Sequence, residues 1–445
     1  METSDPGLIR RAVDAIRNSV TFKLLVMGFL ILVLVIPAEM VKDLISERQG
    51  RRTGAVEEMA QKWGEAQTIA GPVLTIPFHR PFTRQDGTHG QETAYAHFLP
   101  KTLDVGGTLE PEIRYRGIYQ AVLYTAKLAL SARFVRPDFA NLDIAEGDVL
   151  WDRAFLSLGI GDMTGIREAI TITSGRQSFP VNPGIETQEV LASGVSARLP
   201  SGLARGGEIP IDFSLELNGS ERIRFVPVGE TTRVKLSSSW KSPSFDGAFL
   251  PLERVVGASG FSASWKVLHL NRNFPQAWIG PREKIGDAGF GVRLFVAADV
   301  YQQSTRTAKY AVLFLVLTFA TFFFSEIINR RRLHPIQYLL IGFALLIFYS
   351  LLIALSEHLR FGVAYLVSSV AVIGLITLYA RWALASRRLT ALVGGILVVL
   401  YGYLYLVLQL EDYALLMGSI GLFAVLASVM VATRRIDWYE VGRPG

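Results

Sequence analysis

The sequence predicts an α+β membrane protein with six transmembrane helices and a large, mostly antiparallel, sandwich-like β domain outside the cytoplasm, inserted between helices 1 and 2. Two observations predict this architecture. Six apolar runs approach the roughly 20 residues that cross a bilayer as a helix, one near the start and five in the last third. Between them lies a polar region in which apolar and polar residues alternate, as in half-buried strands.

The six apolar runs define the domain order. They cover residues 24–41, 310–328, 336–355, 361–380, 390–410 and 413–431. We therefore expect a cytoplasmic segment at 1–23, helix 1 at 24–41, a β-rich domain at 42–309, a five-helix bundle at 310–431 and a cytoplasmic tail at 432–445. The first run is long and Pro37 with Glu39 makes a poor cleavage site, which favours an uncleaved anchor over a signal peptide.

Basic residues in the short loops predict the orientation, because cytoplasmic loops retain positive charge. The clusters are Arg10, Arg11, Arg17 and Lys23; Arg330, Arg331 and Arg332; Arg381, Arg387 and Arg388; and Arg434 and Arg435. Six crossings place every one of these clusters on one side. Four basic residues after the first run argue for the opposite orientation of that helix: Lys42, Arg48, Arg51 and Arg52. The later loops agree with one another and decide the orientation. Both termini are therefore predicted in the cytoplasm and the β domain outside.

The polar region begins with a helical pattern and continues with strand patterns. Val56, Met59, Ala60 and Trp63 have helical spacing, which predicts an amphipathic helix that continues from or lies near the first span and packs on the domain. From residue 122 to 134 the even positions are apolar, which predicts a long strand with one buried face.

Further strand patterns support a sandwich. Ile211 to Leu217 alternate, Asn218-Gly219 follows, and Ile223 and Phe225 alternate again, which predicts a hairpin turn at Asn218-Gly219. Similar alternation occurs at 234–236 and 261–267. The halves before and after Pro183 would form two related β layers. The Gly-, Pro- and Ser-rich tract 174–207 is typical of loops or of an internal domain junction.

Composition excludes several classes of function. The net charge of +6 is explained largely by the clusters that set topology, so no nucleic-acid partner is predicted. The chain has no cysteine, which rules out thiol catalysis, thiolate metal sites and disulfides.

Motifs for catalysis are absent from the sequence. The histidines show no metal-binding spacing, and no nucleophile elbow is present; they are His79, His89, His97, His269, His334 and His358. Residues 159–165 contain three glycines but lack the features of a phosphate loop, so a strand and turn is the better interpretation. Asn218-Gly219-Ser220 matches a glycosylation sequon, but the predicted hairpin turn is a sufficient explanation of the same Asn-Gly pair. We assign no catalytic, cofactor-binding or metal-binding residue and predict no enzyme.

Charged groups within the bundle are the natural functional candidates, because an unpaired charge in lipid is costly. Glu326 lies near an end of its span, and Arg330 four residues later predicts a pair that anchors this end at the headgroups. Ser356-Glu357-His358 lies at the outer end of the next span, where solvation explains it. Gly418 and Gly421 favour close helix packing. The expected headgroup anchors are Trp382, Trp438 and Tyr439.

Several segments give the chain a family resemblance. They are Arg306 to Ala311, Leu333 to Gly342, Leu355 to His358, Ala70 to Leu74, His97 to Pro100, Arg116 to Tyr119 and Arg435 to Tyr439. On these segments, which span nearly the whole chain, it resembles the CreD family of bacterial inner-membrane proteins, described as cell envelope integrity proteins.

The resemblance implies a Gram-negative inner-membrane protein with a periplasmic β domain, expressed under a two-component system and linked to envelope stress, colicin tolerance and β-lactam response. It brings no ligand or catalytic residue. We therefore expect a non-catalytic envelope protein whose β domain binds an envelope lipid, glycan or protein partner. A transporter or flippase-like component moving an envelope lipid or glycan is the alternative, although transport usually needs polar groups at the midplane.

Overall fold

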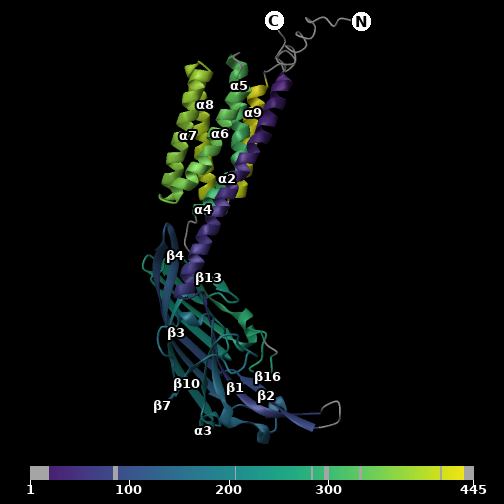
Figure 1. Ribbon diagram of the computed structural model, residues 1–445, viewed down its shortest axis with the longest axis vertical. Helices are drawn as coiled ribbons and strands as arrows, with labels where there is room; N and C mark the ends of the chain where they lie inside the picture. Colours follow the sequence, from purple (N-terminus) through teal and green to yellow (C-terminus); the bar gives the residue numbers. More distant parts are fainter. Residues whose placement is uncertain are drawn as a thin grey trace. The chain divides into compact units, whose positions relative to one another are not determined.

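A computed structural model of the chain describes residues 20–83, 89–205, 207–281, 284–294, 300–329, 333–410 and 413–434 (Figure 1). The chain divides into two compact units. One, the helical unit, combines Met1–Arg51 with Ala298–Gly445, and the other, the β unit, is Arg52–Ala297. The predicted α+β class with a large, mostly antiparallel β region is confirmed. Arg330 and the anchors Trp438 and Tyr439 lie outside the described residues.

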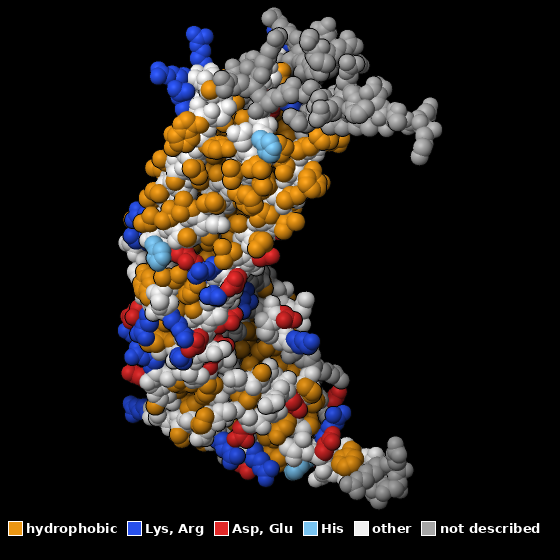
Figure 2. All heavy atoms as spheres, turned by 45° about the horizontal axis from the view of Figure 1, so that its top comes forward, with side chains coloured by type: hydrophobic (Ala, Val, Ile, Leu, Met, Phe, Trp, Pro, Cys, Tyr) orange, Lys and Arg blue, Asp and Glu red, His pale blue; other side chains and the backbone are white. Residues whose placement is uncertain are grey.

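The helical unit contains apolar helices of membrane-spanning length. Its helices are α2 (Val20–Trp63), α4 (Val300–Lys309), α5 (Ala311–Asn329), α6 (Pro335–Ser356), α7 (Phe361–Ala383), α8 (Arg387–Gln409) and α9 (Ala414–Thr433). Within the described residues four helices are long and apolar enough to cross a membrane, and α4 with α5, bent by 45°, would make a fifth. The apolar part of α9 is shorter, Leu416–Val431. Hydrophobic side chains cover the visible face of this unit (Figure 2), as lipid contact requires.

Helix α2 confirms the predicted continuation of the first span, since it runs without interruption from Val20 to Trp63. At about 1.5 Å per residue its 44 residues extend about 66 Å. Ion pairs three or four residues apart stabilise its polar part: Lys42 with Glu39, Arg51 with Glu47 and Lys62 with Glu58.

The end of α2 packs on the β unit, as predicted. The Trp63 indole Nε1 donates to the Tyr124 carbonyl at 3.3 Å, and the Arg114 guanidinium lies 3.9 Å from the Trp63 ring centroid. Arg116 also pairs with Glu58. Hydrogen bonding, stacking and charge together fix this helical segment on the strands that carry Arg114 and Tyr124.

The described residues of the β unit form two sheets. Sheet A has the order β13 (Pro243–Gly247), β17 (Phe290–Leu294), β11 (Arg222–Phe225), β1 (Gln67–Thr83), β5 (Phe155–Ile160), β9 (Gly194–Arg198) and β8 (Asn182–Pro183). Strand β1 also pairs with β2 (His89–Phe98), and β2 pairs with β16 (Ala277–Ile279). Sheet B has the order β14 (Glu253–Gly257), β15 (Gly260–Leu268), β12 (Thr231–Ser238), β3 (Thr102–Arg116), β4 (Tyr119–Val135), β10 (Glu208–Ser220), β6 (Thr171–Ser174) and β7 (Gln177–Pro180).

One hydrophobic core joins the two sheets, as in a sandwich. The ring centroid of Trp265 in β15 lies 5.8 Å from the ring centroid of Phe245 in β13 and 5.8 Å from that of Phe290 in β17. The predicted alternation holds: even residues from Val122 to Phe134 are buried in β4, and the odd residues Ile211 to Leu217 are buried in β10.

Two detailed predictions about this region were wrong. Asn218-Gly219 is not a hairpin turn, because β10 continues through it to Ser220 and the chain then crosses at Glu221 (φ 57°) from sheet B to β11 of sheet A. Nor do the halves around Pro183 form separate layers. β1 pairs in parallel with β11, and β3 with β12, so both halves contribute neighbouring strands to each sheet.

Candidate functional site

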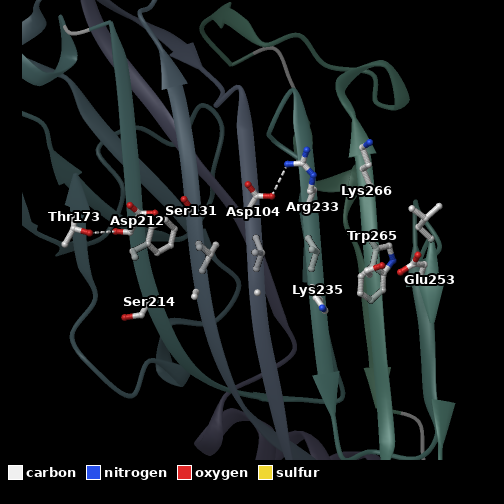
Figure 3. A pocket seen from close by; sticks show the side chains of 18 of the residues that line it. Asp104, Ser131, Thr173, Asp212, Ser214, Arg233, Lys235, Glu253, Trp265 and Lys266 are labelled. Atoms are coloured by element: carbon white, nitrogen blue, oxygen red, sulfur yellow. Dashed lines mark hydrogen bonds and ion pairs between the residues drawn. The ribbon is translucent and has the colours of Figure 1, made fainter. Parts of the chain in front are cut away.

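The outer face of sheet B carries a groove of about 900 Å³ across its strands. Strand pairing aligns two rows of residues on this face (Figure 3). The first row is Thr173, Asp212, Ser131, Asp104, Arg233 and Lys266, and the second is Ser214, Ala129, Gly106, Lys235, Ser264 and Glu253. Because the pleat repeats every two residues, both rows lie on the same face.

Small residues form the floor of this groove and charges form its sides. Ala129 and Gly106 lie side by side in the second row, and a Cβ added at Gly106 would meet no atom within 4 Å. Asp212 and Asp104 make one side acidic. The other side carries three basic residues, Arg233, Lys235 and Lys266, together with Glu253. Arg233 Nη1 lies 3.2 Å from Asp104 Oδ1 where the two sides meet, and both side chains are half exposed. The groove therefore offers hydrogen-bond donors, acceptors and both charges to a polar ligand.

A second cluster joins a hydroxyl, an imidazole and a carboxylate. His97 Nδ1 lies 3.0 Å from Thr75 Oγ1, and His97 Nε2 lies 2.9 Å from Glu189 Oε2. The chain of contacts from hydroxyl to imidazole to carboxylate resembles a catalytic nucleophile, base and acid. Thr75 and His97 are only 2% and 0% exposed, however, so no substrate reaches the hydroxyl. The His97 side chain instead joins β1, β2 and the loop that carries Glu189.

Burial is the main electrostatic influence on His97. It lowers the pKa of the imidazole, and the carboxylate of Glu189 opposes this effect without reversing it. The sequence predicts a surface or structural histidine at this position, and the structure places it in the core. The segment 97–100, one of those that gave the resemblance, therefore has a structural role here.

The glycine-containing stretch 159–165 is a strand followed by a turn, as predicted. β5 ends at Ile160, and Asp162 then accepts hydrogen bonds from the N–H groups of Glu65 at 2.8 Å and Thr164 at 2.9 Å. Burial acts against ionisation, but these donors hold the pKa of Asp162 below its usual range. Across the described residues, no three His, Asp or Glu side chains lie together in a way that could hold a metal ion.

The two carboxylates singled out in the bundle each pair with a cation of α2. Glu326 is 5% exposed; its Oε1 lies 2.6 Å from Lys23 Nζ, and its Oε2 accepts a 3.1 Å hydrogen bond from the Tyr338 hydroxyl. The solvation predicted for Glu357 is wrong, because its side chain is only 8% exposed. Its Oε1 accepts a 3.1 Å hydrogen bond from the Tyr301 hydroxyl, and its Oε2 lies 3.7 Å from Arg48 Nη1. Sequence reasoning could not find these partners, because 303 residues separate Lys23 from Glu326.

The two ion pairs are spaced to match a bilayer. Lys23 and Arg48 are 25 residues apart on one helix, which corresponds to about 38 Å along its axis. That distance falls between the thickness of the hydrocarbon core, about 30 Å, and that of the whole bilayer, about 40–45 Å. Each pair therefore lies near a headgroup region, where a charge costs least.

Apolar helices of membrane-spanning length, joined in one chain to a two-sheet β unit with a polar groove, define a multi-pass membrane protein with a large β domain. The family model described as inner membrane protein CreD matches residues 19–439. The chain is 33% identical over 422 residues to inner membrane protein CreD of Escherichia coli strain K12, an alignment that covers 93% of this chain and 92% of that protein. The chain belongs to the CreD family of inner membrane proteins.

Proposed function

We propose that this protein is a non-catalytic envelope integrity protein that crosses the inner membrane six times. Both termini lie in the cytoplasm, and the β domain between helices 1 and 2 faces the periplasm. Family membership supports the inner-membrane location. The distribution of basic residues supports the orientation. A link to envelope stress, colicin tolerance and β-lactam response would follow from the same role.

The groove on sheet B carries the functional part of the proposal. Hydrogen-bonding side chains on both sides of the small residues Ala129 and Gly106 suit a glycan that bears both hydroxyl and carboxylate groups. Arg233 and Lys235 would contact the carboxylates, and Asp212 would accept from the hydroxyls.

Binding of acidic glycan fragments to the full-length protein tests this proposal. Native mass spectrometry should detect complexes with soluble peptidoglycan fragments, and Arg233→Gln with Lys235→Gln should weaken them about 10-fold or more, as expected for lost charge-assisted bonds. Lys127→Gln is the matched control, since Lys127 lies on the same sheet but pairs with Glu110 at 2.8 Å outside the groove. Equal binding by all three proteins would contradict the assignment of the groove.

A transporter or flippase-like component is the second candidate, and the two buried carboxylates of the bundle favour it. Against it, each carboxylate pairs with a cation of α2 near a helix end rather than at the midplane. Replacing Glu326 and Glu357 by Gln and measuring lipid or glycan movement across proteoliposomes tests this role. Unchanged movement in the double variant would remove these carboxylates from any transport mechanism.

A further inference from the structure

A cavity of about 430 Å³ opens at the end of the bundle where α2 begins. Its walls are one face of α2 from Phe22 to Leu30, Glu326 of α5, the residues just before α6, and Tyr338. The wall formed by Val26 and Leu30 is apolar, whereas Lys23 and Glu326 make the opposite end polar. This division suits an amphiphile whose headgroup enters the cavity while its chain follows α2.

The charges in this cavity are balanced. Lys23 and Glu326 form one ion pair, and the Tyr338 hydroxyl completes the contacts of the carboxylate. An ammonium has three donors and a carboxylate about four acceptor positions, so both groups have capacity beyond this contact. A ligand that carries both a cation and an anion could place its anion at Lys23 and its cation at Glu326, so that neither residue would be buried without an opposite charge.

His334 adds a hydrogen-bond donor for the anionic group of such a ligand. Its Nδ1 accepts from the Ile336 N–H at 3.3 Å as the N-cap of α6. A ring whose Nδ1 accepts carries its proton on Nε2, so Nε2–H is a donor. The positive end of the α6 dipole lies at the same place and favours an anion there.

We propose that this cavity binds the headgroup of a zwitterionic aminophospholipid. The phosphate lies near Lys23, the His334 Nε2–H and the start of α6, while the primary ammonium donates to Glu326. A choline headgroup lacks N–H donors for Glu326, and a purely anionic headgroup offers it no cation. This inference needs only the membrane location and is independent of the function proposed above.

Native mass spectrometry of the purified full-length protein, titrated with phosphatidylethanolamine, phosphatidylcholine or phosphatidylglycerol, tests it. We expect tighter binding of phosphatidylethanolamine, by about 10-fold over phosphatidylcholine, because a charge-assisted hydrogen bond is at stake. Glu326→Gln should abolish this preference. Glu357→Gln is the matched control, since Glu357 also pairs with an α2 cation but does not line the cavity.

A second variant keeps the test valid if Glu326→Gln does not fold. In His334→Asn the new side chain still caps α6, since Asn is a favoured N-cap, but the imidazole donor is lost. This variant should weaken the binding of phosphatidylethanolamine several-fold. Equal affinity for the three lipids, a preference for phosphatidylglycerol, or a preference that survives in Glu326→Gln would each overturn the proposal.

Discussion

Gly219 is expected to be one of the least replaceable residues of the β unit, although it lies within a regular strand. Its backbone conformation is not the reason. A Cβ added there would lie 2.8 Å from Cε2 of the Tyr124 ring and closer still to the hydroxyl oxygen. Tyr124 cannot withdraw, because it is 0% exposed and its hydroxyl donates to the Arg222 carbonyl at 2.7 Å.

The size of the effect follows from overpacking. Extra carbon atoms in a well-packed core cost about 1–3 kcal/mol, and displacing the Tyr124 hydroxyl would also leave the Arg222 carbonyl unpaired at a cost of about 1–3 kcal/mol. For a unit of 246 residues, from Arg52 to Ala297, each kcal/mol lowers the melting temperature by about 2–4 °C. We therefore expect Gly219→Ala to lower it by about 4 °C or more.

Thermal unfolding of the full-length protein, followed by tryptophan fluorescence, measures this change. Gly106→Ala is the matched control, because Gly106 also lies in a strand of sheet B but its added Cβ meets open space. The control should melt within about 2 °C of the unsubstituted protein. Equal melting temperatures for the two variants would refute the argument from Tyr124.

Three further predictions follow from other parts of the chain. Because burial lowers the pKa of His97, the unfolded chain binds more protons than the folded chain near this pKa. The free energy of unfolding should therefore fall as the pH drops below about 6.5. The variant His97→Gln should weaken this pH dependence in thermal unfolding measured between pH 5 and 8. Asp162→Ala should cost about 1–3 kcal/mol or more in denaturant unfolding, since two backbone N–H groups lose their acceptor, whereas Asp162→Asn should recover part of the loss. A Cβ at Gly342 would overlap Leu34, so Leu34→Cys with Gly342→Cys should cross-link α2 to α6 under mild oxidation, and failure to cross-link would contradict their close approach.

Much of this fold could be predicted from local patterns. Alternation in β4, β10, β12 and β15 identified strands and their buried faces, because side chains on a strand repeat every two residues. Helical spacing likewise predicted the extension of α2 to Trp63. These features depend on neighbours in sequence, so one sequence is enough to show them.

The partnerships between distant residues could not be predicted in this way. Asn218-Gly219 has the composition of a turn, but its glycine is required by the Tyr124 ring, which approaches from another strand. The groove on sheet B depends on which strands are neighbours, and Arg233 meets Asp104 only because β12 and β3 pair in parallel. The ion pair between Lys23 and Glu326 has the same origin. Each needs tertiary structure before the residues can be related.

The two parallel strand pairs have a consequence for the order of folding during synthesis. β1 can pair with β11 only after about 150 further residues have been synthesised, and β3 can pair with β12 only after about 130. Until then these strands lack one of their neighbours in the sheet. Contacts this distant in sequence are slow to form and leave apolar strands exposed in the meantime. While the ribosome is still adding residues up to about Leu294, the first half of the β unit has no complete core. It is then most exposed to aggregation and proteolysis, and most dependent on chaperones.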